Sequence, residues 1–428
     1  MKKLVYFMLV AIVAGLASCS DLYEEKYWVT LNEPVFMSAS EFRNSVNVTS
    51  KAEQISDYGK ICYYEGYLFI SATDKGIHII DNRTPASPKN IGFIELMGNA
   101  DISVRDNLLY ADSYIDLVWF DISNPAKPVL KGRLENAFPN VIPPCGNTYS
   151  IDYSSCYDEQ GNLRGIIVGW ELQKTKVAKD DLNYGWYYYG AEMMYDKVTT
   201  ASASSTGING SMSRFAMYKD YLYAVINGKM LIFDVSGSAP KLVSEVNDGV
   251  FYEVETIFSY KDCMFMGMPS GMAIYSVEDP VTPKYCSWIL HIYGCDPVVV
   301  DDDLAYVTVR SGNFCGQTID ELMVIDVKDV YKPALIVSYK MVNPKGLGID
   351  GDKKTLFLCD DGLKAFKIGD DPQTLIANQL THVKGMDGYD LIPFKNTLMM
   401  IAEDGLYQYD YSNLNDIKQI SVIPIRND

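Results

Sequence analysis

The sequence predicts an all-β fold built from repeated four-stranded units. Segments of about 40 residues recur along the chain, and each consists of four short strand-like stretches separated by turns. Tyr, Val and Ile, which favour strands, fill the stretches, and the chain contains 32 tyrosines. Asp, Asn, Pro and Gly lie between them, where turns use their side-chain hydrogen bonds or their backbone freedom. Four-stranded units at this spacing predict the blades of a β-propeller.

Seven units are readable by self-comparison. They cover residues 59–94, 99–134, 214–246, 255–290, 296–339, 346–380 and 390–422. The stretch 140–210 interrupts them, although 149–153 and 165–172 each have the composition of a strand. We interpret this stretch as a degenerate blade with an insertion, which makes eight blades; the alternative is seven blades and a decorated connection. Residues 42–50 are expected to add a strand to the last blade.

Three of the units share a motif in which an apolar strand ends in Asp and a proline-containing turn follows. The segments are IIDNRTPASP from residue 79, WFDISNPAKP from residue 119 and VIDVKDVYKP from residue 324. They resemble the LVIVD repeat family, and the resemblance extends over roughly residues 55–424. It implies a β-propeller of a kind common on bacterial surfaces, few members of which have a known activity.

The first 18 residues have the organisation of a signal peptide. Two lysines precede an apolar run that is too short to span a bilayer, and the sequence LASC then ends at Cys19. This last sequence resembles the lipobox of bacterial lipoproteins, which implies that residues 1–18 are removed and that Cys19 carries acyl chains such as palmitate. Several acyl chains hold a domain at a membrane where one binds only marginally. We therefore expect a lipidated tether at 19–41 and the propeller at 42–428.

Acidic residues follow Cys19 closely, at Asp21, Glu24 and Glu25. They resemble the surface-export signal of Bacteroidetes lipoproteins. The resemblance implies a position on the outer membrane of a Gram-negative bacterium, displayed at the cell surface. An ordinary acidic tether is the alternative interpretation of the same residues.

The composition argues against several classes of partner and site. The formal net charge is −18, and removal of the two N-terminal lysines would make it −20. This charge argues against binding to nucleic acid and against adhesion to anionic lipid. The three histidines, His78, His291 and His382, are too widely spaced to suggest a metal site. The sequence contains no CxxC, GxSxG, HExxH or P-loop motif. We expect no cofactor and no metal, and no catalytic residue can be named.

The residues that precede the inner strands form a column when the units are aligned. They are Gly59, Asp101, Arg214, Glu255, Asp296, Gly346 and Asp390. Two interpretations fit: a ring that binds a ligand or a cation at the mouth of the channel, or side chains that hydrogen-bond neighbouring blades. The loops between second and third strands add Asp74, Asp112, Tyr114, Arg310 and Asp360 to the same face. Arg310 would either clamp a carboxylate or phosphate or neutralise the acidic column.

The insertion contains a dense aromatic run with Tyr184, Trp186, Tyr187 and Tyr188. Exposed aromatic side chains stack on sugar rings or anchor protein interfaces. The alternative is a strand that buries every second ring. Because long loops on a repeat scaffold often carry function, this run is a candidate binding site.

Eight cysteines accompany Cys19. Cys295 and Cys315 fall on one face of the same unit in the repeat alignment, so a disulfide between them is feasible. Cys62 and Cys359 lie within strands and are expected to be buried thiols.

These observations favour a lipoprotein, facing the surface or the periplasm, that acts as a binding or interaction module for a glycan or an envelope protein. They favour a non-enzymatic role. One alternative is a hydrolase or lyase acting on a polysaccharide, because acidic pairs are numerous and their separation is invisible in sequence. The other is a structural partner in an envelope complex.

Overall fold

A computed structural model describes residues 26–55, 59–178, 208–211, 213–226, 228–268, 270–290, 297–311 and 319–425. The chain divides into two compact units. One contains the chain up to Phe36 together with Cys145–Glu192, and the other contains Met37–Pro144 and the chain from Met193 onward. Within the described ranges no helix has the length and apolar character needed to cross a membrane.

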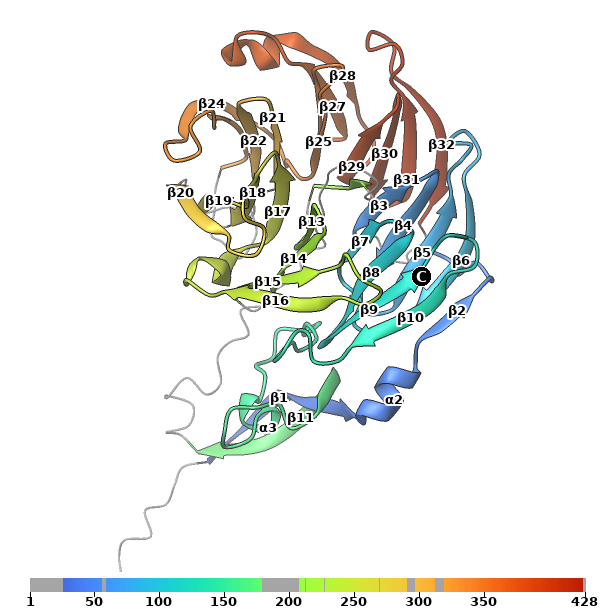
Figure 1. Cartoon of the computed structure of the whole chain (residues 1–428), viewed down its shortest axis with the longest axis vertical. Helices are drawn as coiled ribbons and strands as arrows, with labels where there is room; N and C mark the ends of the chain where they lie inside the picture. Colours follow the sequence, from blue (N-terminus) through green and yellow to red (C-terminus); the bar gives the residue numbers. More distant parts are fainter. Residues whose placement is uncertain are drawn as a thin grey trace, which may run out of the picture. The chain divides into compact units, whose positions relative to one another are not determined.

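The larger unit is a ring of seven antiparallel four-stranded blades around a common axis (Figure 1). Each blade forms from one contiguous stretch of chain, as the sequence predicts. The first strands of successive blades contact one another, and the first strand of blade 7 contacts that of blade 1, which closes the ring. The prediction of an all-β propeller is therefore confirmed.

The strand boundaries follow the repeat closely. Blades 1 to 3 contain β3 (Ile61–Tyr64), β4 (Tyr67–Ala72), β5 (Gly76–Asp81) and β6 (Lys89–Glu95); β7 (Ile102–Arg105), β8 (Leu108–Ser113), β9 (Asp116–Asp121) and β10 (Val129–Leu134); and β13 (Phe215–Tyr218), β14 (Tyr221–Ile226), β15 (Lys229–Asp234) and β16 (Lys241–Val246). Blades 4 to 7 contain β17 (Thr256–Tyr260), β18 (Cys263–Met268), β19 (Gly271–Ser276) and β20 (Lys284–Leu290); β21 (Val298–Asp301), β22 (Leu304–Val309), β23 (Glu321–Asp326) and β24 (Ala334–Lys340); β25 (Leu347–Asp350), β26 (Thr355–Cys359), β27 (Leu363–Lys367) and β28 (Gln379–Val383); and β29 (Gly388–Phe394), β30 (Thr397–Ala402), β31 (Gly405–Asp410) and β32 (Lys418–Pro424). Short 3-10 helices occur at η1 (Val250–Glu253) and η2 (Pro372–Asn378).

The expected eighth blade at 140–210 is wrong, and the alternative of seven blades with a decorated connection holds. The predicted inner strand at 149–153 contributes only an isolated bridge from Ile151, because Asp152 caps a short helix, α3 (Tyr153–Cys156). The predicted second strand is real and longer than expected, as β11 (Ile166–Ala178). It pairs with β1 (Lys26–Met37) in a separate two-stranded sheet instead of joining a blade.

Part of the predicted tether at 19–41 is folded. In addition to β1, it contains the first half of helix α2 (Ala39–Asn44), which starts with a capping box between Ser38 and Glu41. The side chain of Phe42 is fully buried and stacks on Tyr114 of blade 2, with ring centroids 6.0 Å apart. Helix α2 is therefore fixed to the ring, because its one buried side chain lies inside blade 2.

The strand β2 (Asn47–Thr49) follows α2 and pairs with β6, the outer strand of blade 1. The expectation that residues 42–50 extend the last blade is therefore wrong. Because α2 is fixed on blade 2, the chain that leaves it reaches the adjacent blade 1. Blade 1 consequently has its outer edge covered by an added strand.

The Asp at the end of the third strand explains the repeat motif. In five blades its carboxylate accepts the backbone N–H of the residue two positions later, which starts the turn to the fourth strand. The residues are Asp81, Asp121, Asp234, Asp326 and Asp410. In blade 4 the hydroxyl of Ser276 takes this place, and blade 6 has Lys367 there.

The contact between blades 7 and 1 is the seam of the ring, because the chain does not connect these two blades directly. At the seam Gln408 Nε2 donates to Asn82 Oδ1 over 2.6 Å, and both residues are buried. The positions equivalent to Asn82 hold Ile122, Val235, Val277, Val327, Ile368 and Tyr411, and those equivalent to Gln408 hold Ile79, Trp119, Ile232, Ile274, Val324 and Ala365. The seam therefore carries a polar pair where the other blade contacts are apolar or aromatic.

Candidate functional site at the axis of the ring

A short stretch of chain occupies the centre of the ring. We call it the axial segment: residues 208–211 and 213, which lead into blade 3. Its first part, β12 (Ile208–Asn209), pairs with the free inner edge of β3 in blade 1. Gly210 extends the pairing by donating its N–H to the carbonyl of Ile61 over 3.0 Å. A strand from outside the repeats thus lies on the axial side of blade 1.

The two serines of the axial segment connect four further blades. Ser211 donates through its N–H and its Oγ to Asp390 Oδ1 of blade 7, over 2.8 and 2.9 Å. The same Oγ accepts the N–H of Leu347 in blade 6 over 2.8 Å. Ser213 donates to Asp101 in blade 2, and its carbonyl accepts the N–H of Ile257 in blade 4 over 2.8 Å. The axial segment therefore bonds to five blades and continues covalently into a sixth.

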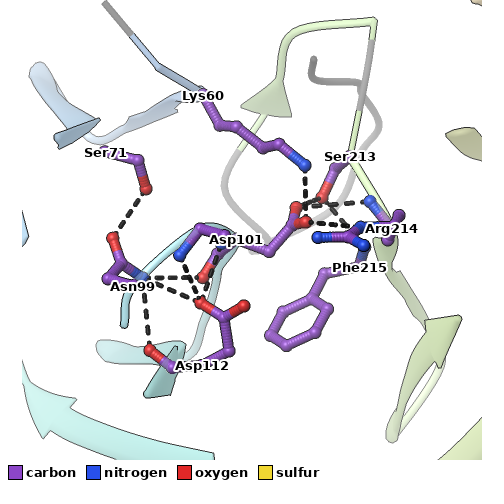
Figure 2. A network of polar contacts seen from close by, with 9 residues as sticks. Lys60, Ser71, Asn99, Asp101, Asp112, Ser213, Arg214 and Phe215 are labelled. Carbon is purple, nitrogen blue, oxygen red and sulfur yellow. Dashed lines mark hydrogen bonds and ion pairs between the residues drawn. The ribbon is translucent and has the colours of Figure 1, made fainter. Parts of the chain in front are cut away.

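Asp101 is the centre of a buried polar network at this end of the ring (Figure 2). Lys60 of blade 1 donates to its Oδ2 over 2.6 Å, and Figure 2 shows Lys60 and Ser213 reaching the carboxylate from two sides. Arg214 of blade 3 adds a backbone hydrogen bond to Oδ1 over 3.2 Å and an ion pair with Oδ2 over 3.5 Å. Asp101 is 1% exposed and Lys60 6%. One carboxylate thus joins three blades away from solvent.

Asp112 lies beside this network and caps the loop before β7. Its Oδ1 accepts the N–H groups of Ala100 and Asp101 over 2.7 and 2.8 Å, and the amide of Asn99 over 3.1 Å. Burial raises the pKa of Asp112 to about 7, and the nearby charge of Asp101 acts in the same direction. Burial also lowers the pKa of Lys60, although its ion pair with Asp101 opposes the shift.

Asp390 is fully buried at the axis between blades 6, 7 and 1. Burial raises its pKa well above the usual range, against the hydrogen bonds from Ser211 that favour the charged form. Among the described residues its Oδ2 has no hydrogen-bond partner. A protonated Asp390 still accepts both bonds from Ser211 on Oδ1, so the contact with the axial segment does not require the negative charge.

The structure brings some of the predicted site residues together. Asp101, Asp112 and Asp390 all lie at the axial end of the blades. Asp101 bonds to Lys60 of blade 1 and to Arg214 of blade 3, which is the kind of contact between blades that one of the two interpretations expects, whereas Asp390 bonds to Ser211 of the axial segment. Tyr114 is instead a buried packing residue, with φ 46°, whose ring fills the space that Gly98 leaves open. Arg310 follows β22 on the predicted loop and is half-buried.

Several predicted residues lie outside the described part of the chain. These are Cys19, Tyr184, Trp186, Tyr187, Tyr188, Asp296, Cys295 and Cys315. The expected burial of Cys62 and Cys359 is confirmed, and burial raises the pKa of both thiols.

The sequence reasoning missed Lys60, Ser211 and Ser213. Lys60 stands next to the aligned column, one position after Gly59, and its charge opposite Asp101 was a usable signal. The serines carry no comparable signal, because the segment that contains them belongs to the stretch 140–210 in which the repeat cannot be aligned.

The chemistry of the axial site is that of a closed ionic network. Two cations, Lys60 and Arg214, surround Asp101, while Asp112 changes its protonation near neutral pH. Within the described ranges no three His, Cys, Asp or Glu side chains gather as a possible metal site. The network can hold blades together and exchange a proton.

Comparison with known families identifies the repeat. The LVIVD repeat matches residues 58–93, 98–136 and 209–248, which are blades 1, 2 and 3. The chain carries LVIVD repeats. Two of the three segments with the Asp and proline motif lie in these matches. The third lies in blade 5, which has the same four strands without a match. No curated protein is similar to the chain in sequence.

Solved structures with similar folds have low sequence identity to this chain. Hsv2 of Kluyveromyces lactis is 12% identical, with a TM-score of 0.45 over 87% of this chain and 99% of Hsv2. The dihydro-heme d1 dehydrogenase NirN is 11% identical, with a TM-score of 0.48 over 92% of this chain and 80% of NirN. PorZ, a surface component of the type-IX secretion system of Porphyromonas gingivalis, is 10% identical, with a TM-score of 0.44 over 89% of this chain and 39% of PorZ. At these sequence identities and TM-scores, the resemblance says nothing about the activity of this chain.

Proposed function

We propose that this chain is a binding module of the bacterial envelope, held at a membrane by lipid on Cys19, which engages a partner protein through an exposed blade edge. The charged groups at the axial mouth are buried and bonded to one another, so they are poorly placed to meet a large partner. The observation that carries the proposal is the outer edge of blade 4, the strand β20.

β20 exposes three large apolar or aromatic side chains, more than any other outer strand in the described ranges. Tyr285 is 49% exposed, Trp288 38% and Leu290 74%. Lys284, at its start, is the only charged residue of the strand. Tyr331, from the turn of blade 5, is 60% exposed and lies beside Cys286 of β20. An apolar strand edge with few charges is a template for pairing with another chain.

The outer edge of blade 1 supports the proposal that the partner contributes a strand. There the equivalent edge, β6, is covered by β2, which pairs antiparallel through Asn47, Val48 and Thr49. The fold therefore accepts an added strand on the outside of a blade. A strand from a partner would gain main-chain hydrogen bonds to β20 and side-chain contacts with Trp288 and Leu290.

The test uses a photo-crosslinking residue in place of Trp288 in living cells. We expect a covalent adduct with one protein, and its loss when Leu290→Lys is added, because a charge on the edge opposes strand pairing. Leu335→Lys, on the outer strand β24 of blade 5, is the matched control and should leave the adduct intact.

Affinity for the captured protein then measures the edge directly. Truncating a central aromatic anchor costs about 2 kcal/mol or more, so Trp288→Ala should weaken binding by about thirtyfold. A polysaccharide that binds the chain and is unaffected by Leu290→Lys would contradict the proposal and favour a glycan-binding module. Release of the protein from the membrane fraction by Cys19→Ser tests the anchor separately.

A further inference from the structure

The β1–β11 sheet of the smaller unit has one aromatic and basic face. We propose that this face rests on anionic lipid headgroups, next to the acyl chains on Cys19. The inference rests on the proposed lipid anchor and adds a second, non-covalent contact with the membrane. It concerns the smaller unit, whereas the proposed partner strand binds to the propeller.

Strand alternation assigns the side chains to the two faces of the sheet. On β11, Trp170, Leu172, Lys174 and Lys176 share one face. Trp28 of β1 joins this face, because Lys176 Nζ lies 5.1 Å from its ring centroid. We call these five residues the basic face of the sheet. Leu172, Lys174 and Lys176 are exposed, and Trp28 is 66% exposed.

The acidic residues of the two strands lie on the other face. Glu171 of β11 and Glu33 of β1 alternate with the residues of the basic face and therefore point away from it. In a chain of formal net charge −18, the basic face combines two lysines with no carboxylate of its own strands. Its charge is complementary to phosphate-bearing headgroups, whereas that of the whole chain is not.

The aromatic side chains suit the same surface. Trp favours the boundary between hydrocarbon and water, where its ring meets apolar chains and its N–H meets polar groups. Lysine side chains place their methylene groups along apolar surface and their ammonium groups among the headgroups. Trp28 and Lys176, already stacked on each other, provide both features at one point.

The length of chain before β1 places the anchor nearby. Six residues, 20–25, separate Cys19 from the start of β1 at Lys26. Fully extended, the seven steps from Cys19 to Lys26 span at most about 25 Å. An acylated Cys19 in the membrane therefore keeps β1 within this distance of the headgroups, which makes a weak contact by the basic face effective.

The experiment measures binding of the chain from residue 19 onward, with Cys19→Ser so that no acyl chain contributes. Sedimentation is compared between vesicles of phosphatidylcholine containing phosphatidylglycerol and vesicles of phosphatidylcholine alone. We expect binding to the anionic vesicles only. Lys174→Gln with Lys176→Gln should weaken it by about thirtyfold, since each lysine near an anionic surface contributes about a factor of five.

The matched control removes two exposed lysines from the propeller, Lys328→Gln with Lys332→Gln, and should change binding less than twofold, a difference of about 0.4 kcal/mol. Brominated lipids should quench the parent chain more than the Trp28→Phe variant. Equal losses in the two double variants, or no preference for anionic vesicles, would overturn the proposal. The mass of the acyl group on Cys19 in wild-type protein is measured separately, so failure of the basic face is distinguishable from failure of the anchor.

Discussion

Replacing Gln408 by Ile should destabilise the ring, and replacing Asn82 by Val in the same chain should restore most of the loss. In the single variant Gln408→Ile, Asn82 Oδ1 loses its donor, 2.6 Å away, in a position only 2% exposed. A buried polar group left without a partner costs about 1–3 kcal/mol. Asn82→Val alone should cost a similar amount, because it leaves Gln408 Nε2 without its acceptor.

The double variant removes both polar groups and gives the seam an Ile and a Val. This is the pair present between blades 4 and 5, where Ile274 and Val327 belong to one buried apolar cluster. Replacement of both partners by apolar groups of similar shape is nearly neutral. Among the described residues Gln408 Oε1 already lacks a partner, so its removal costs nothing further. We therefore expect the double variant to be more stable than either single variant.

The assay is equilibrium unfolding in urea for the four chains, with the denaturant dependence checked for constancy. Ile232→Ala and Val277→Ala, at the apolar contact between blades 3 and 4, form the control cycle. Each leaves a cavity, and together they should cost at least as much as either alone. A double seam variant that loses the sum of its two single losses would refute the reasoning, because it would show that Asn82 and Gln408 do not depend on each other.

Three further predictions concern the network and the helix α2. Asp112→Asn should flatten the pH dependence of stability. Burial raises the pKa of Asp112 from 3.8 to about 7, so the contribution of Asp112 to the free energy of unfolding is largest in acid and is lost as the pH rises through about 7. Unfolding at several pH values measures this dependence. Lys60→Met should cost about 3 kcal/mol or more in unfolding free energy by leaving Asp101 with one less buried cation, and an unchanged midpoint would contradict the pairing. Phe42→Ala should cost about 3–5 kcal/mol, and tryptic cleavage at Arg43 should become faster if α2 leaves blade 2.

Much of the fold was predictable because its elements repeat. In five blades an Asp starts the turn after the third strand, as Asp121 does through its bond to the N–H of Ser123. Because this interaction is local, the same residues produce the same turn wherever they occur. The eighth blade was wrong for a related reason. The strand content of 165–172 was correct, but strand content does not name the pairing partner, and β1 lay in a segment interpreted as a tether. Asp101 and Asp390 were found by alignment of the repeat, whereas Ser211 and Ser213 bond across the axis to blades distant in sequence and leave no local pattern.

Several segments outside the repeat make their contacts at blade 1, where the ring closes. In six of the contacts between blades, the chain also links the two blades covalently, either directly or through a longer connection. Blades 7 and 1 have only non-covalent contacts. Blade 1 receives both added strands, β2 on its outer edge and β12 on its inner edge. The axial segment that contains β12 also bonds to Asp390 of blade 7, and Ser421 of blade 7 donates to the carbonyl of Pro85 in blade 1 over 2.6 Å. These contacts and the Asn82–Gln408 pair favour association of the last blade with the first blade of the same chain, because only that arrangement satisfies all of them at once.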